Sequence, residues 1–122
     1  MSAAALRSAL IVDDDRVQRR QISLYLDRLG VKTLEAEDGE AAVQIVREFQ
    51  PAVIIMDIAM PKMDGLAAAC AIQGVYSPKI ILMTGDADSF YRANVERPKV
   101  FAVVEKPIPL PSLSRFVLQA LG

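Results

Sequence analysis

Five polar side chains stand at the ends of apolar segments of the chain, and their types suit the chemistry of phosphate and metal ions. They are Asp13, Asp14, Asp57, Thr84 and Lys106. Each has an ordinary explanation when taken alone, because acids cap helices, a threonine often closes a strand and a lysine often ends in solvent. The case for chemistry therefore depends on whether the surrounding elements bring the five side chains to one place.

Short apolar segments alternate with longer segments of helical periodicity along the whole chain. Strands are predicted over 9–12, 32–36, 52–56, 80–83 and 100–104, and helices over 15–29, 38–49, 65–73, 87–95 and 112–121. Most of the strand segments are continuously apolar, which indicates strands covered on both faces and hence a parallel sheet. The pattern predicts an α/β fold, a doubly wound five-stranded parallel sheet in a (βα)5 flavodoxin-like three-layer sandwich.

The helices carry further local signals. Asp15 followed by Gln18 resembles a capping box at the start of the first helix, and Gly30 suits the left-handed residue that ends it. Apolar stripes are predicted at Ile22, Tyr25, Leu26 and Leu29 in the first helix and at Ala42, Val46 and Phe49 in the second. The single cysteine, Cys70, lies among small residues of the third helix and is predicted to be a buried thiol.

The length and composition exclude several classes of function. The 122 residues suit a single domain spanning 1–122, and the net charge of −1 gives no attraction to nucleic acid. The short apolar start of the chain fits neither a signal peptide nor a membrane span, so we expect no membrane contact and, without a disulfide, a cytoplasmic location. The absence of histidine excludes Ser-His-Asp catalysis and His-ligated zinc.

Ligands of doubly wound sheets bind at the carboxyl ends of the strands, which is where the polar side chains are predicted to lie. Three carboxylates brought together there repel one another, and a hard divalent cation relieves the repulsion. We expect Mg²⁺, for which Mn²⁺ can substitute, with Asp14, Asp57 and the backbone carbonyl of Ala59 as direct ligands and Asp13 bound through water. Without the metal, the domain is expected to be less stable than its Asp14→Ala variant.

The same edge holds the groups that phosphoryl transfer requires. Asp57 is a candidate nucleophile, as carboxylates are in aspartyl-phosphate enzymes. The metal would neutralise one phosphoryl oxygen, the Lys106 ammonium a second, and the Thr84 hydroxyl would donate to a third.

The motifs around these residues resemble those of response-regulator receiver domains over essentially the whole chain. The matching segments are LIVDDD at 10–15, VIIMDIAMPKMDG at 53–65, MTGD at 83–86 and EKP at 105–107. The resemblance implies that Asp57 is the phosphoacceptor, Thr84 the switch residue and Lys106 the phosphate-binding lysine, with a cis peptide bond between Lys106 and Pro107. It further implies a signalling switch of a two-component system or phosphorelay, whose only activity is magnesium-dependent autophosphorylation and slow autodephosphorylation.

The resemblance also implies partners. The phosphoryl donor would be a phosphohistidine on a histidine kinase or histidine phosphotransfer protein. The output protein or domain would bind the face formed by the fourth helix, the fifth strand and the fifth helix. Four arginines give the first helix a basic face, which we expect to be solvated surface, with docking of the donor as the alternative. They are Arg16, Arg19, Arg20 and Arg28.

The chain departs from the family at one position that matters for output. Many members carry Tyr or Phe three residues before the lysine, whereas this chain has Val103. Phe101 shares a strand face with Val103 and is a displaced substitute, although we favour simple packing for it. We therefore expect activation to move Thr84 and the fourth helix without an aromatic rotamer change. Asp86 lies where the family tunes hydrolysis, and we favour its reading as a helix N-cap.

Other classes of protein fit less well. A haloacid-dehalogenase-type phosphatase would use Asp13 as nucleophile, because residues 13–17 fit its DxDx(T/V) motif, but it needs further acids after the lysine and none follows Lys106. A flavodoxin-like nucleotide binder would offer amides rather than three aspartates to phosphate. A receiver-like interaction domain with degenerate output stays open because of Val103.

Overall fold

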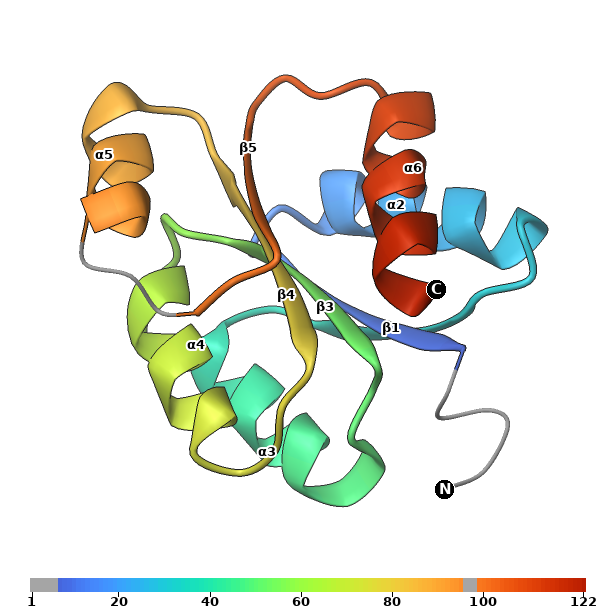
Figure 1. The fold of residues 1–122 in the computed structure, drawn as a ribbon, viewed down its shortest axis with the longest axis horizontal. Helices are drawn as coiled ribbons and strands as arrows, with labels where there is room; N and C mark the ends of the chain where they lie inside the picture. The colour runs from blue at the N-terminus through green and yellow to red at the C-terminus, as the bar shows by residue number, and fades with distance from the viewer. Residues whose placement is uncertain (1–6, 96–98) are drawn as a thin grey trace.

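The computed structural model describes residues 7–95 and 99–122, which form strands and helices in strict alternation (Figure 1). The strands are β1 (Ser8–Val12), β2 (Lys32–Ala36), β3 (Val53–Asp57), β4 (Lys79–Thr84) and β5 (Ala102–Glu105). The helices are α2 (Arg16–Arg28), α3 (Gly39–Phe49), α4 (Gly65–Gln73), α5 (Ala87–Val95) and α6 (Leu110–Leu121).

The strands form one parallel sheet in the order β2-β1-β3-β4-β5. Helices α3, α4 and α5 cover one face of the sheet, and α2 and α6 cover the other (Figure 1). The predicted α/β fold is therefore confirmed, including the sheet topology of a doubly wound sandwich. The strand order reverses between β1 and β3, so these two neighbouring strands flank the point where such folds bind ligands.

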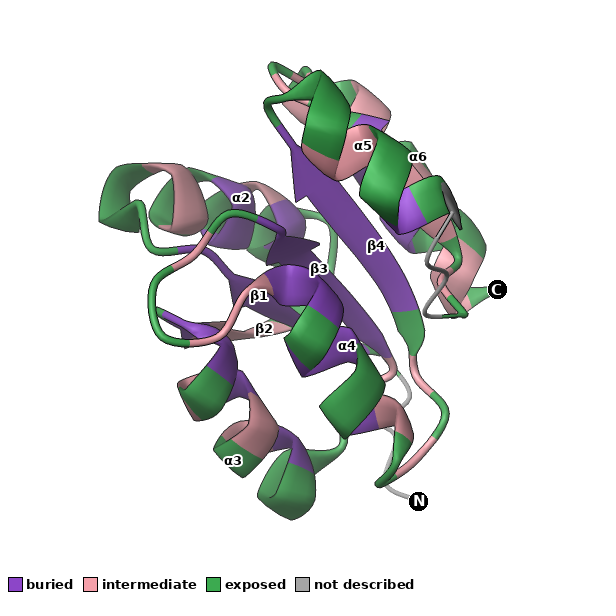
Figure 2. Cartoon of the chain, turned by 90° about the vertical axis from the view of Figure 1, so that its left-hand side faces the viewer, coloured by how far each residue is buried: buried purple, intermediate pink, exposed green. Residues whose placement is uncertain are grey.

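Each face of the sheet carries its own core. Leu10 and Ile54 pack toward α3 and α4, whereas Ile11 and Ile55 pack toward α2 and α6. Every residue of β1 and β3 is buried, and the central strands are buried along nearly their whole length (Figure 2). Because side chains alternate between the faces of a strand, burial on both faces requires continuous apolar segments. Each fully buried side chain of this size contributes about 1.5–3 kcal/mol to folding.

The structure differs from the predicted boundaries at the carboxyl end of the chain. Helix α6 begins at Leu110 rather than at residue 112, with Pro111 in its first turn. A proline is tolerated there because the first helical N–H groups have no partner within the helix. Strand β5 begins at Ala102, two residues later than predicted, and β4 extends to Thr84.

Three apolar or thiol side chains predicted to be buried are exposed instead. Cys70 is exposed because α4 turns Ala68, Ala69 and Ile72 toward the sheet and leaves position 70 on the outer side. Leu29 is 41% exposed and Phe49 is 52% exposed, since both lie at the ends of helices where the chain leaves the core. None of the helices in the described residues has the length and apolarity needed to cross a bilayer.

Candidate functional site

The three predicted metal-binding carboxylates lie together at the carboxyl edge of the sheet. Asp13 and Asp14 directly follow β1, and Asp57 is the last residue of the adjacent strand β3. One carboxylate oxygen from each residue lies within 4.8 Å of the other two. Asp13 and Asp57 are buried and Asp14 is exposed, so the cluster opens to solvent on the Asp14 side.

Asp13 has one oxygen with a partner and one without. Its Oδ1 accepts a hydrogen bond from the backbone N–H of Asp15 at 2.9 Å, whereas its buried Oδ2 has no hydrogen-bond partner among the described residues. Burial raises the pKa of Asp13, and repulsion from Asp57 and Asp14 adds to this, against the Asp15 hydrogen bond and the attraction of Lys106. A buried oxygen left without a partner is costly, and a hard cation would satisfy it. The donor set therefore fits Mg²⁺.

Lys106 brings a positive charge to the same cluster from the end of β5. Its Nζ donates to Asp57 Oδ2 at 2.9 Å and to Gln18 Oε1 at 3.1 Å, and lies 3.8 Å from Asp13 Oδ2. Burial disfavours the ammonium, but the hydrogen bond and attraction to Asp57 outweigh burial and raise the pKa of Lys106. The peptide bond between Lys106 and Pro107 is cis, as the resemblance implied.

Thr84 is buried at the end of β4, but its hydroxyl is engaged by the loop that follows. Thr84 Oγ1 donates to the carbonyl of Asp86 at 3.1 Å and accepts from the backbone N–H of Asp86 at 3.2 Å. Asp86 in turn accepts the backbone N–H of Ser89 at 2.7 Å, so its predicted role as helix N-cap is confirmed. That hydrogen bond and the one from the Ser89 hydroxyl lower the pKa of Asp86.

The loop after Asp57 fits closely against the strand end. The N–H of Gly65 donates to the carbonyl of Ile58 at 2.8 Å, and a β-carbon at Gly65 would collide with the carbonyl oxygen of Asp57. Glycine at position 65 therefore allows α4 to begin directly beside the cluster. Ala59 lies in this loop and is exposed, and the role of its carbonyl as a metal ligand stays a prediction.

The capping-box prediction at the first helix is wrong in its second half. Asp15 Oδ1 does accept the N–H groups of Val17 and Gln18, but the N–H of Asp15 donates to Asp13 and not to the Gln18 side chain. The Gln18 side chain is bonded to Lys106 instead, 88 positions away in the sequence.

The contact of Arg19 with the acidic cluster, like that of Gln18 with Lys106, was not predicted from the sequence. Its Nη1 donates to the carbonyl of Asp13 at 2.7 Å and its Nε to Glu35 at 3.0 Å, while Arg20 donates to the other oxygen of Glu35. The Arg19 side chain is only 14% exposed, so it is not part of a solvated basic face. A local pattern carries no signal for such contacts, because Glu35 lies on the neighbouring strand β2.

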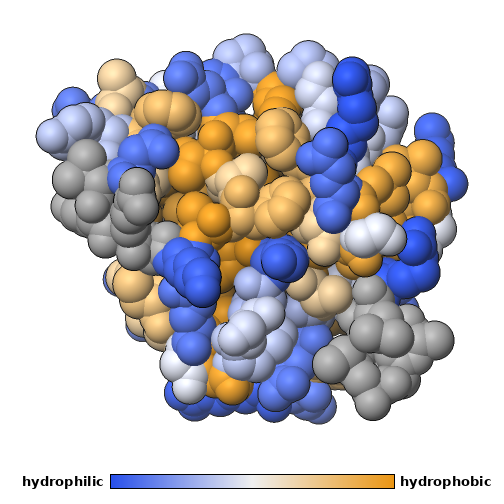
Figure 3. All heavy atoms as spheres, viewed as in Figure 1, coloured by the Kyte–Doolittle hydropathy of each residue, from blue (hydrophilic) through white to orange (hydrophobic). Residues whose placement is uncertain are grey.

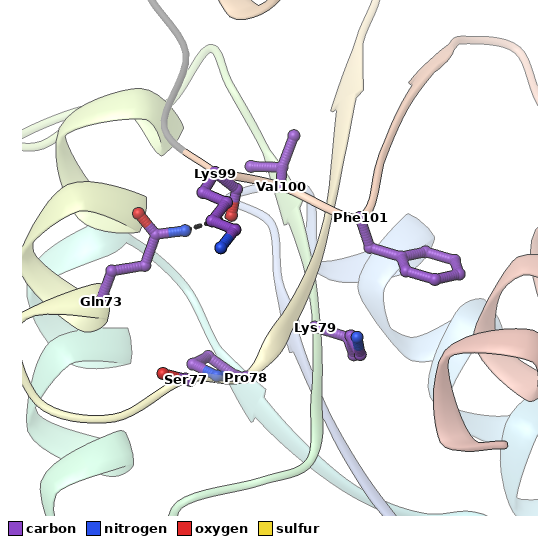
Figure 4. A pocket seen from close by; sticks show the side chains of 7 residues that line it. All are labelled: Gln73, Ser77, Pro78, Lys79, Lys99, Val100 and Phe101. Carbon is purple, nitrogen blue, oxygen red and sulfur yellow. Dashed lines mark hydrogen bonds between the residues drawn. The ribbon is translucent and has the colours of Figure 1, made fainter.

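Phe101 lies at the opposite end of β5 from the acidic cluster. Its ring sits 5.8 Å from the Lys79 ammonium, beside a hollow of about 560 Å³ that also contacts Gln73 and Lys99 (Figure 4). None of the predicted site residues lines this hollow. Val103 packs against the core on the α4 side of the sheet. Phe101 itself is 40% exposed and belongs to neither core, so its packing is confined to the edge of the sheet beside Lys79.

Comparisons with known proteins identify the family of the chain. Residues 9–117 match the family of response regulator receiver domains. The chain is 39% identical over 82 residues to the Autoinducer 1 sensor kinase/phosphatase LuxN of Vibrio campbellii, which covers 66% of this chain and 10% of that protein. It is 34% identical over 118 residues to the regulatory protein AtoC of Escherichia coli, covering 96% of this chain and 26% of that protein. The chain therefore spans a minor part of both relatives.

Two solved structures show the same likeness. The N-terminal domain of a response regulator/sensory box/GGDEF 3-domain protein from Carboxydothermus hydrogenoformans superposes with a TM-score of 0.84 at 28% identity, covering 93% of each chain. The signal receiver domain of a histidine kinase from Syntrophus aciditrophicus also has a TM-score of 0.84, at 27% identity, covering 93% of this chain and 89% of that one. Together with the sheet order and the residues at its carboxyl edge, these matches show that the chain belongs to the response regulator receiver domains of two-component signalling.

Proposed function

We propose that this receiver domain takes a phosphoryl group from a phosphohistidine donor onto Asp57 and thereby switches its interactions with partners. The observation that carries the proposal is the placement of Asp57. Its Oδ2 accepts from the Lys106 ammonium at 2.9 Å, and its carboxylate lies within reach of Asp13 and Asp14. Within the acidic cluster of Asp13, Asp14 and Asp57, it is Asp57 whose oxygen accepts a hydrogen bond from the Lys106 ammonium, and this suits a nucleophile next to a compensating charge.

The metal in this proposal is Mg²⁺, for which Mn²⁺ can substitute. Asp14, Asp57 and the carbonyl of Ala59 would bind it directly, and Asp13 would bind it through water. The unpartnered, buried Oδ2 of Asp13 supports a cation at this place. When bound, the ion would neutralise one phosphoryl oxygen and the negative charge of the carboxylates.

The chain's own residues carry the transfer. A carboxylate oxygen of Asp57 forms a bond to phosphorus while the bond from phosphorus to the donor imidazole nitrogen breaks, and the imidazole leaves with the electron pair. The Lys106 ammonium, already beside Asp57, stabilises the charge on a second phosphoryl oxygen. Thr84 must release Asp86 before its hydroxyl donates to the third oxygen. Attack of water on phosphorus then breaks the bond to the Asp57 oxygen, releases inorganic phosphate and restores the carboxylate.

Receiver domains work with histidine kinases and output domains, and we propose the specific surfaces here. The donor is a histidine kinase or histidine phosphotransfer protein. The output partner binds the face of α5, β5 and α6, where apolar side chains gather in the middle of the molecule (Figure 3). Partly exposed apolar residues of this region include Phe101 on the β5 side and Leu118 on α6. A cytoplasmic location stays a prediction from the sequence.

The phosphatase alternative is disfavoured by the position of Asp13. Its side chain is 0% exposed, compared with 8% for Asp57, and its Oδ1 is held by the N–H of Asp15, whereas a nucleophile must approach a substrate phosphorus. The family match over residues 9–117 also assigns the chain to receivers. An interaction domain without phosphorylation is the remaining alternative, and it differs from the proposed function in that it would not be labelled by a phosphodonor.

The test is incubation with acetyl phosphate and Mg²⁺ followed by intact-mass measurement. Wild type is expected to gain one phosphoryl group, and Asp57→Asn none. Asp88→Asn, which removes an exposed acid of α5, serves as the matched control and should label like wild type. Equal labelling of wild type and Asp57→Asn would overturn the choice of Asp57, and no labelling of wild type would favour an interaction domain.

A further inference from the structure

We propose that Gln18 is a positioning residue that holds the Lys106 ammonium in place for phosphoryl transfer. The Gln18 side chain reaches from the first turn of α2 to the end of β5 and accepts a hydrogen bond from Lys106 Nζ at 3.1 Å. The kinetic part of this inference rests on the function proposed above. The contact itself can be measured without phosphorylation.

Lys106 needs such a partner because its side chain is long and flexible. A lysine ammonium on a four-carbon stem has many rotamers, and one acceptor does not fix its direction. Here the second acceptor comes from a different element than Asp57. Asp57 lies on β3 and Gln18 on α2, while Asp13 Oδ2, at 3.8 Å, is too far for a hydrogen bond. The two bonds together define where the ammonium stands.

An amide suits this role better than a carboxylate. The carbonyl oxygen of glutamine accepts a hydrogen bond but carries no net charge, so it orients the ammonium without neutralising it. The bond to Asp57 must change when that carboxylate becomes an acyl phosphate. The bond to Gln18 does not depend on the charge of Asp57, so it can hold the ammonium throughout the transfer.

The position of Gln18 is itself fixed by contacts to the acidic loop. Its backbone N–H donates to Asp15 Oδ1 at 3.1 Å. The next residue, Arg19, donates to the carbonyl of Asp13 at 2.7 Å and to Glu35 on β2. The first turn of α2 is therefore hydrogen-bonded to the loop that carries Asp13. These bonds fix the backbone of Gln18, so its side chain can orient Lys106.

The test compares Gln18→Met with wild type in the acetyl phosphate reaction. Methionine matches glutamine in length and in helix propensity but offers no oxygen acceptor. We expect the labelling rate at saturating donor to fall about three- to tenfold, the range of one typical hydrogen bond, because the bond to Asp57 keeps Lys106 near the site. The donor concentration for half-maximal rate and the unfolding transition should change little. Gln21→Met, at an exposed position of the same helix, is the matched control and should behave as wild type.

A double-mutant cycle separates positioning from a general structural effect. If Gln18 acts through Lys106, then Gln18→Met should cause no further loss in a Lys106→Met background. An undiminished loss in that background, or a wild-type rate for Gln18→Met alone, would overturn the inference.

A readout on the lysine itself keeps the inference testable if the proposed function fails. Should wild type not label at all, the proposed function is wrong, and the NMR signals of the Lys106 ammonium and its ε-carbon then decide on Gln18. Gln18→Met should shift and broaden these signals as the ammonium loses an acceptor, and Gln21→Met should leave them unchanged. Unchanged Lys106 signals in Gln18→Met would disprove the positioning role.

Discussion

The site has two parts with different contacts: Lys106 after β5 with its acceptors, called here the Lys106 side, and Thr84 at the end of β4 with the loop that follows, called the Thr84 side. On the Lys106 side, the ammonium already contacts Asp57 at 2.9 Å and is held by Gln18 at 3.1 Å. On the Thr84 side, the hydroxyl both donates to and accepts from the backbone of Asp86. Lys106 is thus already bonded to Asp57, whereas the Thr84 hydroxyl is bonded to the following loop.

This difference suggests two separate roles in the proposed function. Lys106 would compensate charge during transfer, and Thr84 would change its contacts on phosphorylation. The positive charge that would stabilise the proposed transfer already lies beside Asp57, so it would need no rearrangement during the reaction. The Thr84 hydroxyl must give up its bonds to Asp86, the residue that also caps α5 through Ser89. Movement of Thr84 would thus loosen the first turn of α5. In the proposed transfer, Lys106 would act without changing place, whereas the contacts of Thr84 with Asp86 would have to change.

The largest expected effect is on the labelling rate, when the Lys106 ammonium and the Thr84 hydroxyl are removed in separate variants. With Mg²⁺ and acetyl phosphate, Lys106→Met should label Asp57 at least about 100-fold more slowly, because a preorganised charge beside the phosphoryl group is lost. Thr84→Ala should label within about tenfold of wild type, because its hydroxyl is not yet in place. Rates are measured by intact mass against time. Equal slowing by both variants would show that the two sides are not functionally distinct.

The acidic cluster gives a smaller effect, on stability. Because burial raises the pKa of Asp13, ionisation of its carboxyl group destabilises the folded state. This cost is absent below the unfolded pKa, grows as the pH rises from the unfolded to the folded pKa, and is fully present above the folded pKa. In EDTA at pH 7, Asp13→Asn should raise the free energy of unfolding by about 1 kcal/mol. Asp14 is exposed, so the stabilisation predicted from the sequence for Asp14→Ala should be smaller than that of Asp13→Asn.

Urea unfolding with and without Mg²⁺ checks this prediction. The ion should stabilise wild type and reverse the advantage of Asp13→Asn, since binding to the folded state adds to stability. A destabilised Asp13→Asn in EDTA would show that burial of Asp13 is already compensated within the protein.

The smallest expected effect concerns the ion pairs of Glu35 with Arg19 and Arg20, which hold the start of α2 beside Asp13. Burial alone would raise the pKa of Glu35, but hydrogen bonds from Arg20 and Arg19 outweigh it and lower the pKa. A lowered carboxyl pKa contributes stability above its unfolded value, which is lost as the pH falls through the folded pKa. Glu35→Gln should therefore lose about 0.5 kcal/mol at pH 7 and converge with wild type in acid.

The exposed neighbour Glu37 provides the control for this measurement. Glu37→Gln should match wild type in urea unfolding at both pH values, because the residue is exposed. A loss for Glu35→Gln that persists in acid would mean that the effect comes from packing and not from the ion pair.

The sequence alone determined the fold and the set of residues at the carboxyl edge. Continuous apolar segments indicated a parallel sheet, and the carboxyl ends of parallel strands lie along one edge. Asp13, Asp14, Asp57 and Lys106 therefore had to approach one another wherever the helices came to lie. Local patterns also identified Gly30, whose φ of 82° is left-handed, and the cap at Asp86.

Only the tertiary structure decided which way individual side chains turn. Gln18 follows the local rule of a capping box yet bonds to Lys106, because the end of β5 brings an ammonium within its reach. Cys70 sits among small residues yet is exposed, because the rotation of α4 is set by its contacts with the sheet. Local patterns fix strand ends and helix caps, but the partner of a side chain depends on residues that are distant in the sequence, and folding alone brings these together.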